Sequence, residues 1–161
     1  MANLTDTAPV LQKTEEGEKL HRVLFVCTGN TCRSPMAAAA YNHKNRGSHR
    51  RAYSAGLAAL AGDPISQNAI LALEAAGIPS TPDNDYKAHV ATPVTLTMLG
   101  EMDEIVAISP SHAMALLTAA PQYAARIRTL GDIADPYGGD LATYSAALAD
   151  ILSALEGENA N

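Results

Sequence analysis

Short apolar runs along the chain predict four β-strands. Residues 23–27 read Val-Leu-Phe-Val-Cys, five consecutive apolar or thiol side chains bounded by turn-forming residues. Such a run is typical of a strand that is buried on both faces in the middle of a parallel sheet. Similar runs span residues 51–57 and 104–108, and a weaker one spans 126–130.

Between these runs, apolar residues recur at helical spacing, and Pro, Ser and Gly mark helix starts and ends. The predicted helices run from Ser34 or Pro35 to just before Gly47, over 63–77, over 92–100, over 109–120, and from Leu141 through a stripe ending at Leu155. Strands that alternate with helices predict an α/β fold: one domain with an open, mainly four-stranded parallel sheet, helices on both faces and a site at the carboxyl ends of the strands.

Composition narrows the class of protein. The chain has 161 residues, 47% of them hydrophobic, and a net charge of −6, which suits one folded domain and argues against nucleic acid as a partner. No apolar run reaches 18 residues and no signal-peptide pattern opens the chain, so we expect no membrane partner and a cytoplasmic protein. Residues 1–20 are predicted to be a mobile extension, 21–157 the folded domain and 158–161 a tail.

Residues 28–34 follow the first predicted strand and combine turn formers with a helix start. Gly29 and Asn30 are the residue types that most readily adopt positive φ, so the backbone can curl and gather its N–H groups. Ser34 is a preferred N-cap, and Pro35 suits the first helical position. A concavity of N–H groups at a helix N-terminus binds anions. The segment therefore predicts a site for phosphate and similar oxyanions such as vanadate and sulfate.

Cys27 and Arg33 add reactive chemistry to this anion site. A thiol beside such a concavity and a guanidinium is favoured as the thiolate, the nucleophilic form. Arg33 offers a planar fork of donors that matches two phosphate oxygens, and Ser34 is placed to donate its hydroxyl to the sulfur. The five histidines are scattered without ligand spacing, so no metal or other cofactor is expected.

The segment Val-Cys-Thr-Gly-Asn-Thr-Cys-Arg-Ser-Pro-Met-Ala closely resembles the phosphate loop of the low-molecular-weight protein tyrosine phosphatase family, and Asp135-Pro136-Tyr137 matches the family's second motif. The resemblance implies a hydrolase in which Cys27 forms a cysteinyl-phosphate, Arg33 holds the phosphoryl oxygens and Asp135 is the general acid. It also implies that Ser54 hydrogen-bonds Asn30 and that Cys32 can form a protective disulfide with Cys27. The implied phosphate-binding loop comprises Thr28, Gly29, Asn30, Thr31, Cys32, Arg33 and Ser34.

Two features leave the phosphorylated protein or peptide substrate open between phosphotyrosine and phosphoarginine. Thr31 occupies a position that is commonly a larger aliphatic in the tyrosine-specific members and Thr in the protein-arginine phosphatase branch, which Asp-Pro-Tyr-Gly-Gly also resembles. The chain has no Trp and one Phe, so Tyr137 is the candidate wall of a wide or polar substrate slot. The family name favours phosphotyrosine, with phosphoarginine as the alternative.

Other interpretations fit less well. A thioredoxin-coupled arsenate reductase of this fold needs a further downstream cysteine, and none follows Cys32. A non-catalytic anion-binding module needs neither a nucleophile nor an acid. The basic residues near 43–51 read as a solvated helix end more than as a docking patch, and His89 reads as structural.

Overall fold

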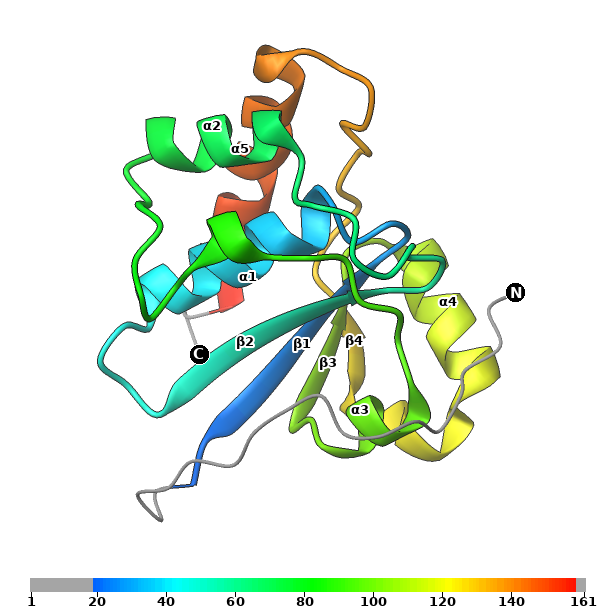
Figure 1. The fold of residues 1–161 in the computed structure, drawn as a ribbon. Coiled ribbons are helices and arrows are strands. Elements are labelled where there is room, and N and C mark those ends of the chain that lie inside the picture. Colours follow the sequence, from blue (N-terminus) through cyan, green and yellow to red (C-terminus); the bar gives the residue numbers. More distant parts are fainter. Residues whose placement is uncertain (1–18, 159–161) are drawn as a thin grey trace.

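The four apolar runs form one parallel sheet in the computed structural model, which describes residues 19–158. The strand order is β2-β1-β3-β4, and all neighbours are parallel, so β1 lies in the middle and β2 at an edge (Figure 1). The strands span His21–Cys27 (β1), Arg50–Gly56 (β2), Glu104–Ala107 (β3) and Ile127–Thr129 (β4). The predicted fold class is confirmed.

Helices cover both faces of the sheet. They span Arg33–Lys44 (α1), Gln67–Ala75 (α2), Leu96–Gly100 (α3), Pro110–Ala119 (α4) and Leu141–Glu158 (α5), with 3₁₀ turns at Tyr86–Ala88 and Pro121–Arg126. In β1, Val23 and Phe25 pack into the core beneath α1, α2 and α5, while Leu24 and Val26 pack into the core beneath α3 and α4. This alternation explains the unbroken apolar run, because a central strand buries both of its faces.

The predicted start of the first helix was wrong by one to two residues. Helix α1 begins at Arg33, with Cys32 at the N-cap position, and the Ser34 side chain caps nothing. Its hydroxyl lies instead 2.9 Å from the Cys27 sulfur and 2.7 Å from the Asn30 side-chain nitrogen. Tertiary contacts at the loop therefore override the local capping preference of serine.

Two further helices begin later than predicted. Helix α2 begins at Gln67 rather than at 63, because the Asp63 carbonyl accepts the Ala91 N–H and the Ser66 N–H donates to the loop carbonyl of Thr31. Helix α3 begins at Leu96 rather than at 92. The preceding segment 92–94 pairs instead with Gly56 at the end of β2.

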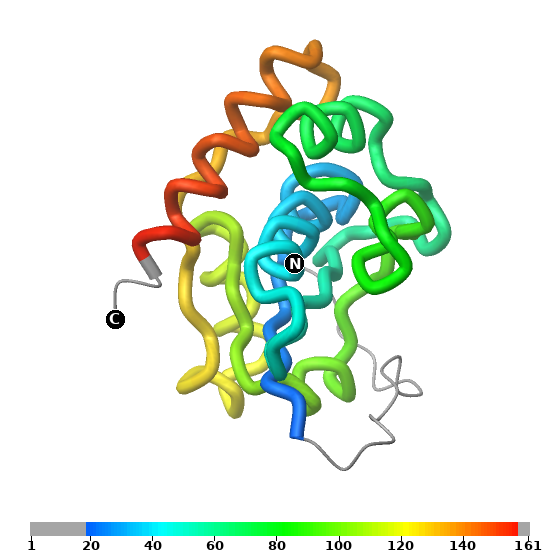
Figure 2. Tube along the Cα trace, turned by 90° about the vertical axis from the view of Figure 1, so that its left-hand side faces the viewer, coloured from blue at the N-terminus to red at the C-terminus, as the bar shows by residue number. Residues whose placement is uncertain are grey.

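The chain ends can be compared with the prediction only where the structure describes them. Helix α5 continues to Glu158, past the predicted stripe, and packs along α1 and α2 (Figure 2). Residues 1–18 of the predicted extension and residues 159–161 of the predicted tail lie outside the described residues. Between 19 and 158, no helix is both long enough and apolar enough to cross a membrane.

Candidate active site

A pocket of about 260 Å³ lies at the carboxyl end of β1. It brings together residues far apart in the sequence: Cys27, the following loop through Arg33, Asp135 and Tyr137, with Ala58, Leu60 and Asp63 completing the wall. Ser34 and Ser54 do not line this pocket. Their hydroxyl oxygens each accept a hydrogen bond from the side chain of the loop residue Asn30.

The loop N–H groups are available to an anion. Within residues 19–158, the backbone N–H groups of 28–33 donate no hydrogen bond to the protein. Cys27 itself is buried, and its sulfur lies 2.9 Å from the Ser34 hydroxyl. A run of six unpaired N–H groups between a strand end and a helix start is the arrangement that binds phosphate.

Asn30 holds the curl of the loop. It is the one described non-glycine residue with positive φ, at 59°, and four contacts fix it. Its side-chain nitrogen donates to Ser34 at 2.7 Å and to Ser54 at 3.0 Å. Its side-chain oxygen accepts the Thr92 N–H at 2.8 Å, and its carbonyl lies 2.8 Å from His89 Nε2. The left-handed conformation is thus stabilised from three other segments of the chain.

His89 belongs to this support, which gives its predicted structural role a specific partner in the loop. Burial lowers the pKa of His89, so the neutral ring donates Nε2–H to the Asn30 carbonyl. The signal that pointed here was a family histidine near this position, and the missing neighbouring arginine obscured it.

Gly56 supports the loop from the end of β2. A Cβ at this position would lie 2.5 Å from the Thr28 carbonyl oxygen and 3.0 Å from the Asn30 Cβ. The same carbonyl accepts the Ala58 N–H at 2.9 Å. Only glycine allows the loop to pack this closely on the strand, a requirement that the sequence analysis did not predict.

Arg33 and Asp135 meet across the pocket. The Arg33 guanidinium is buried, donates to the Ile133 carbonyl at 3.0 Å and lies 3.6 Å from an Asp135 carboxylate oxygen. The Asp135 side chain is about half exposed, and its other oxygen accepts the Tyr137 N–H at 3.1 Å. The loop after β4 therefore holds a carboxylate at the mouth of the anion site.

Cys32 has a partner that the sequence did not indicate. Its sulfur lies 3.2 Å from the Tyr144 hydroxyl of α5, which also accepts a hydrogen bond from Ser66 at 2.9 Å. Burial, followed by the hydrogen bond to Cys32, raises the pKa of Tyr144. Both cysteines are free thiols and both are buried.

A second histidine that the sequence missed also contacts the loop. The buried His112 of α4 places Nε2 3.0 Å from the Thr28 hydroxyl. Burial and, next, the Arg33 guanidinium lower the pKa of His112, which keeps its ring neutral beside the cationic site.

Charged side chains away from this pocket are the ones that a metal site or a docking patch would need. Among the described residues, no group of three His, Cys, Asp or Glu side chains is arranged to hold a metal ion. In the basic segment near 43–51, Lys44 donates to the Leu155 carbonyl, Arg46 to the His43 carbonyl and Arg50 to the Tyr41 hydroxyl. These three basic side chains thus have partners within the protein, and the solvated helix end stays a prediction.

The fold and this site define a cysteine-dependent phosphatase: a thiol at the end of the central strand, an arginine six residues later and a carboxylate from a distant loop. The chain belongs to the low molecular weight phosphotyrosine protein phosphatase family, whose model matches residues 22–158. Members of this family act on phosphorylated substrates.

The chain is similar to known proteins of two kinds, some named protein-arginine phosphatases and others protein-tyrosine phosphatases. It is 40% identical over 131 residues to a protein-arginine-phosphatase of Geobacillus stearothermophilus, covering 79% of this chain and 86% of that protein. It is 36% identical over 156 residues to the low molecular weight protein-tyrosine phosphatase A of Mycobacterium bovis, covering 87% and 90%. A crystal structure of a low molecular weight protein tyrosine phosphatase from T. tengcongensis matches with a TM-score of 0.78 and 35% identity, covering 86% and 97%.

Proposed function

We propose that this protein removes phosphate from protein side chains through a cysteinyl-phosphate intermediate. The observation that carries the proposal is the set of unpaired N–H groups around the Cys27 thiol, with Arg33 and Asp135 at the same pocket. The Cys27 thiolate attacks phosphorus, while the N–H groups and Arg33 hold the three non-bridging oxygens.

Ser34 stabilises the thiolate, and Asp135 transfers protons in both steps, formation of the cysteinyl-phosphate and its hydrolysis. Because the Ser34 oxygen accepts a hydrogen bond from Asn30, its own hydrogen is directed to the Cys27 sulfur, 2.9 Å away. Asp135 protonates the departing atom of the substrate. Its carboxylate then takes a proton from the water that hydrolyses the cysteinyl-phosphate, which returns the thiolate and releases phosphate.

Phosphotyrosine is the substrate that family membership favours. Two large apolar side chains at the pocket, Leu60 and Tyr137, are 70% and 76% exposed. Exposed apolar groups beside a binding pocket suit a flat aromatic ring, which would bury them when it binds.

The cellular location is a separate part of the proposal. The free thiols suit a reducing compartment, and we place the protein in the cytoplasm.

Phosphoarginine is a second candidate, favoured by two polar side chains in the same pocket. Thr31 supplies a hydroxyl, and Asp63 supplies a carboxylate for which the described residues provide no hydrogen-bond or ion-pair partner. A guanidino group carries several N–H donors that a carboxylate accepts well. A phenol ring offers such a carboxylate nothing.

The test of the proposal is phosphate release from matched phosphotyrosine and phosphoarginine peptides, expressed as a ratio of kcat/KM. Turnover should be inhibited by vanadate and insensitive to chelators. A ratio far above or below one identifies the substrate class. Chelator-sensitive turnover, or no turnover of either peptide, would overturn the proposal.

Thr31→Ile should shift the kcat/KM ratio toward phosphotyrosine by about tenfold, because the change removes a hydroxyl and adds apolar surface beside the ring. Thr31→Val is the matched control that removes the hydroxyl and keeps the size. An unchanged ratio in both variants would leave Thr31 without a part in specificity.

Asp63→Asn should lower kcat/KM for the phosphoarginine peptide by about tenfold and leave the phosphotyrosine value within about twofold, since only the guanidino group uses the carboxylate. Asp150→Asn, on the exposed side of α5, is the control for net charge. Equal losses on both substrates would argue against a contact between Asp63 and the guanidino group.

Oxidation should join Cys27 and Cys32. Hydrogen peroxide converts the Cys27 thiolate to a sulfenic acid, and the Cys32 sulfur displaces its oxygen as water, forming the S–S bond. Peptide mapping should find this intramolecular disulfide, and a dithiol reductant should restore activity. In Cys32→Ser, peroxide should cause a loss that the dithiol does not reverse. Two free thiols after inactivation of the wild type would discard the disulfide.

A further inference from the structure

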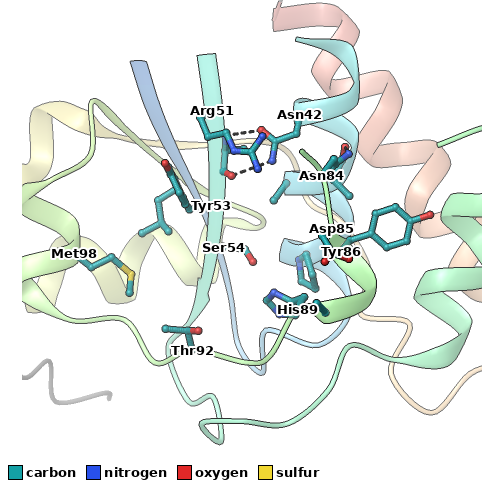
Figure 3. Close-up of a pocket in the computed structure, with 16 residues that line it drawn as sticks. Asn42, Arg51, Tyr53, Ser54, Asn84, Asp85, Tyr86, His89, Thr92 and Met98 are labelled. Atoms are coloured by element: carbon teal, nitrogen blue, oxygen red, sulfur yellow. Dashed lines mark hydrogen bonds between the residues drawn. The ribbon is translucent and has the colours of Figure 1, made fainter. Parts of the chain in front are cut away.

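A second pocket, of about 310 Å³, lies along the free edge of β2 (Figure 3). It shares no lining residue with the pocket around Cys27. Helix α1 forms one wall with Pro35, Ala38 and Ala39, the segment 84–92 forms another, and Tyr53 and Met98 lie on the opposite side of the strand.

The backbone of β2 explains why this pocket is a candidate binding site. Even-numbered residues of β2 direct their N–H and carbonyl groups away from β1. Those of Ala52 pair with the Asn42 side chain, and those of Gly56 pair with the segment 92–94. Between them, the N–H and carbonyl of Ser54 have no hydrogen-bond partner among residues 19–158. We call the N–H and carbonyl of one outward-facing residue a rung of the sheet edge. The Ser54 rung is thus open, and it faces the pocket.

The neighbouring rung shows which chemistry completes such a pair. The Asn42 carboxamide oxygen accepts the Ala52 N–H at 2.7 Å, and its nitrogen donates to the Ala52 carbonyl at 3.1 Å (Figure 3). A planar amide that carries a donor and an acceptor on one side therefore matches a single rung of this edge. A peptide strand does not fit, because the rungs on either side are already occupied.

The remaining lining favours a small, neutral ligand. Apolar side chains of α1 and Met98 offer contact to a ring, and the pocket volume of about 310 Å³ suits a small-molecule ligand. One basic side chain, Arg51, and one acidic side chain, Asp85, line the pocket, so neither sign of charge is selected. Burial lowers the pKa of His89 and keeps its ring uncharged.

We propose that this pocket binds a neutral small molecule through a primary carboxamide or lactam group that pairs with the Ser54 backbone. The same wall holds the phosphate loop, because Ser54, His89 and Thr92 each hydrogen-bond Asn30. A ligand that fixes this wall changes the affinity of the loop for phosphate, and phosphate changes the affinity for the ligand by the same factor. The binding step is independent of which phosphorylated residue the enzyme hydrolyses.

The test uses benzamide on the full chain, followed by amide resonances in ¹H–¹⁵N spectra. Benzamide should bind with a dissociation constant on the order of 1 mM, and the Ser54 N–H should show the largest downfield shift. N,N-dimethylbenzamide lacks the donor and benzoate lacks both the donor and neutrality, so each should bind at least about tenfold more weakly. Equal binding of the three compounds, largest shifts in residues 28–33, or no saturable binding would overturn the site.

Two further measurements separate the parts of the proposal. Ala38→Leu, which adds bulk to the pocket wall, should abolish benzamide binding, whereas Ala154→Leu on α5 should not. If Ala38→Leu does not fold, the three-compound series on the wild type decides. Saturating benzamide should change the dissociation constant of inorganic phosphate by at least about threefold. An unchanged phosphate affinity would overturn the link between the pocket and the loop.

Discussion

Cys27→Ser should reduce kcat on both peptides by roughly 10⁴-fold or more, because a hydroxyl is a far weaker nucleophile than a thiolate and the serine has no general base beside it. The variant should still bind inorganic phosphate, since the N–H groups of 28–33 and Arg33 remain in place. The measurement is turnover paired with isothermal titration of phosphate. The phosphate titration also serves as the control that the loop is folded.

Each outcome of that experiment has a distinct meaning. Residual activity at a tenth of the wild-type level would remove Cys27 as the nucleophile. Loss of phosphate binding together with turnover would show that the sulfur is needed to shape the loop. The contact between Cys27 and Ser34 at 2.9 Å fits a shaping contribution only if Ser34→Ala produces the same loss of phosphate binding.

Asp135→Asn should lower kcat by roughly 10²–10⁴-fold, because the amide cannot give a proton to the leaving atom or take one from water. The loss should be greatest for aryl phosphates with poor leaving groups, such as phenyl phosphate, and smallest for p-nitrophenyl phosphate, whose phenolate departs without help. Steady-state rates across a series of substituted phenyl phosphates measure this dependence. Phosphate affinity should change little, since the N–H groups and Arg33 bind the anion.

The matched control is Asp132→Asn, a change of the same kind three residues earlier in an exposed position that does not line the pocket. It should leave the dependence on leaving group unchanged. A uniform loss across the series in Asp135→Asn would contradict the acid role. That result would point instead to the 3.6 Å pairing of Asp135 with Arg33 as its contribution, through the position of the guanidinium.

The central strand and the reactive loop could be read from the sequence because their signals are local. Five apolar residues in succession require burial on both faces, and they form the middle strand, β1. Asn30, next to Gly29, adopts the positive φ that its residue type tolerates. The identities and spacing of Cys27 and Arg33 indicated the chemistry. Two side chains six positions apart in one tight loop lie close together in space, and both line the same pocket.

Helix starts were predicted less well, and for one physical reason. Ser34, Asp63-Pro64 and Thr92-Pro93 all have good local helix-start chemistry, yet each segment makes a competing tertiary contact. The Ser34 hydroxyl contacts the Cys27 sulfur. In residues 63–66, the first carbonyl accepts the N–H of residue 91 and the last N–H donates to the loop. Residues 92–94 hydrogen-bond to the edge of β2. A capping preference contributes about 1 kcal/mol, which a few long-range hydrogen bonds readily exceed.

By itself, the sequence determined the parallel α/β fold and the thiol–arginine loop, because apolar periodicity and short-range spacing act within a few residues. Only the tertiary structure brought Asp135 to Arg33, set His89 and Thr92 on Asn30, placed Tyr144 against Cys32 and left one rung of β2 open beside Ser54. These contacts join residues separated by dozens of positions. Their geometry depends on how the sheet and helices pack, which no local pattern encodes.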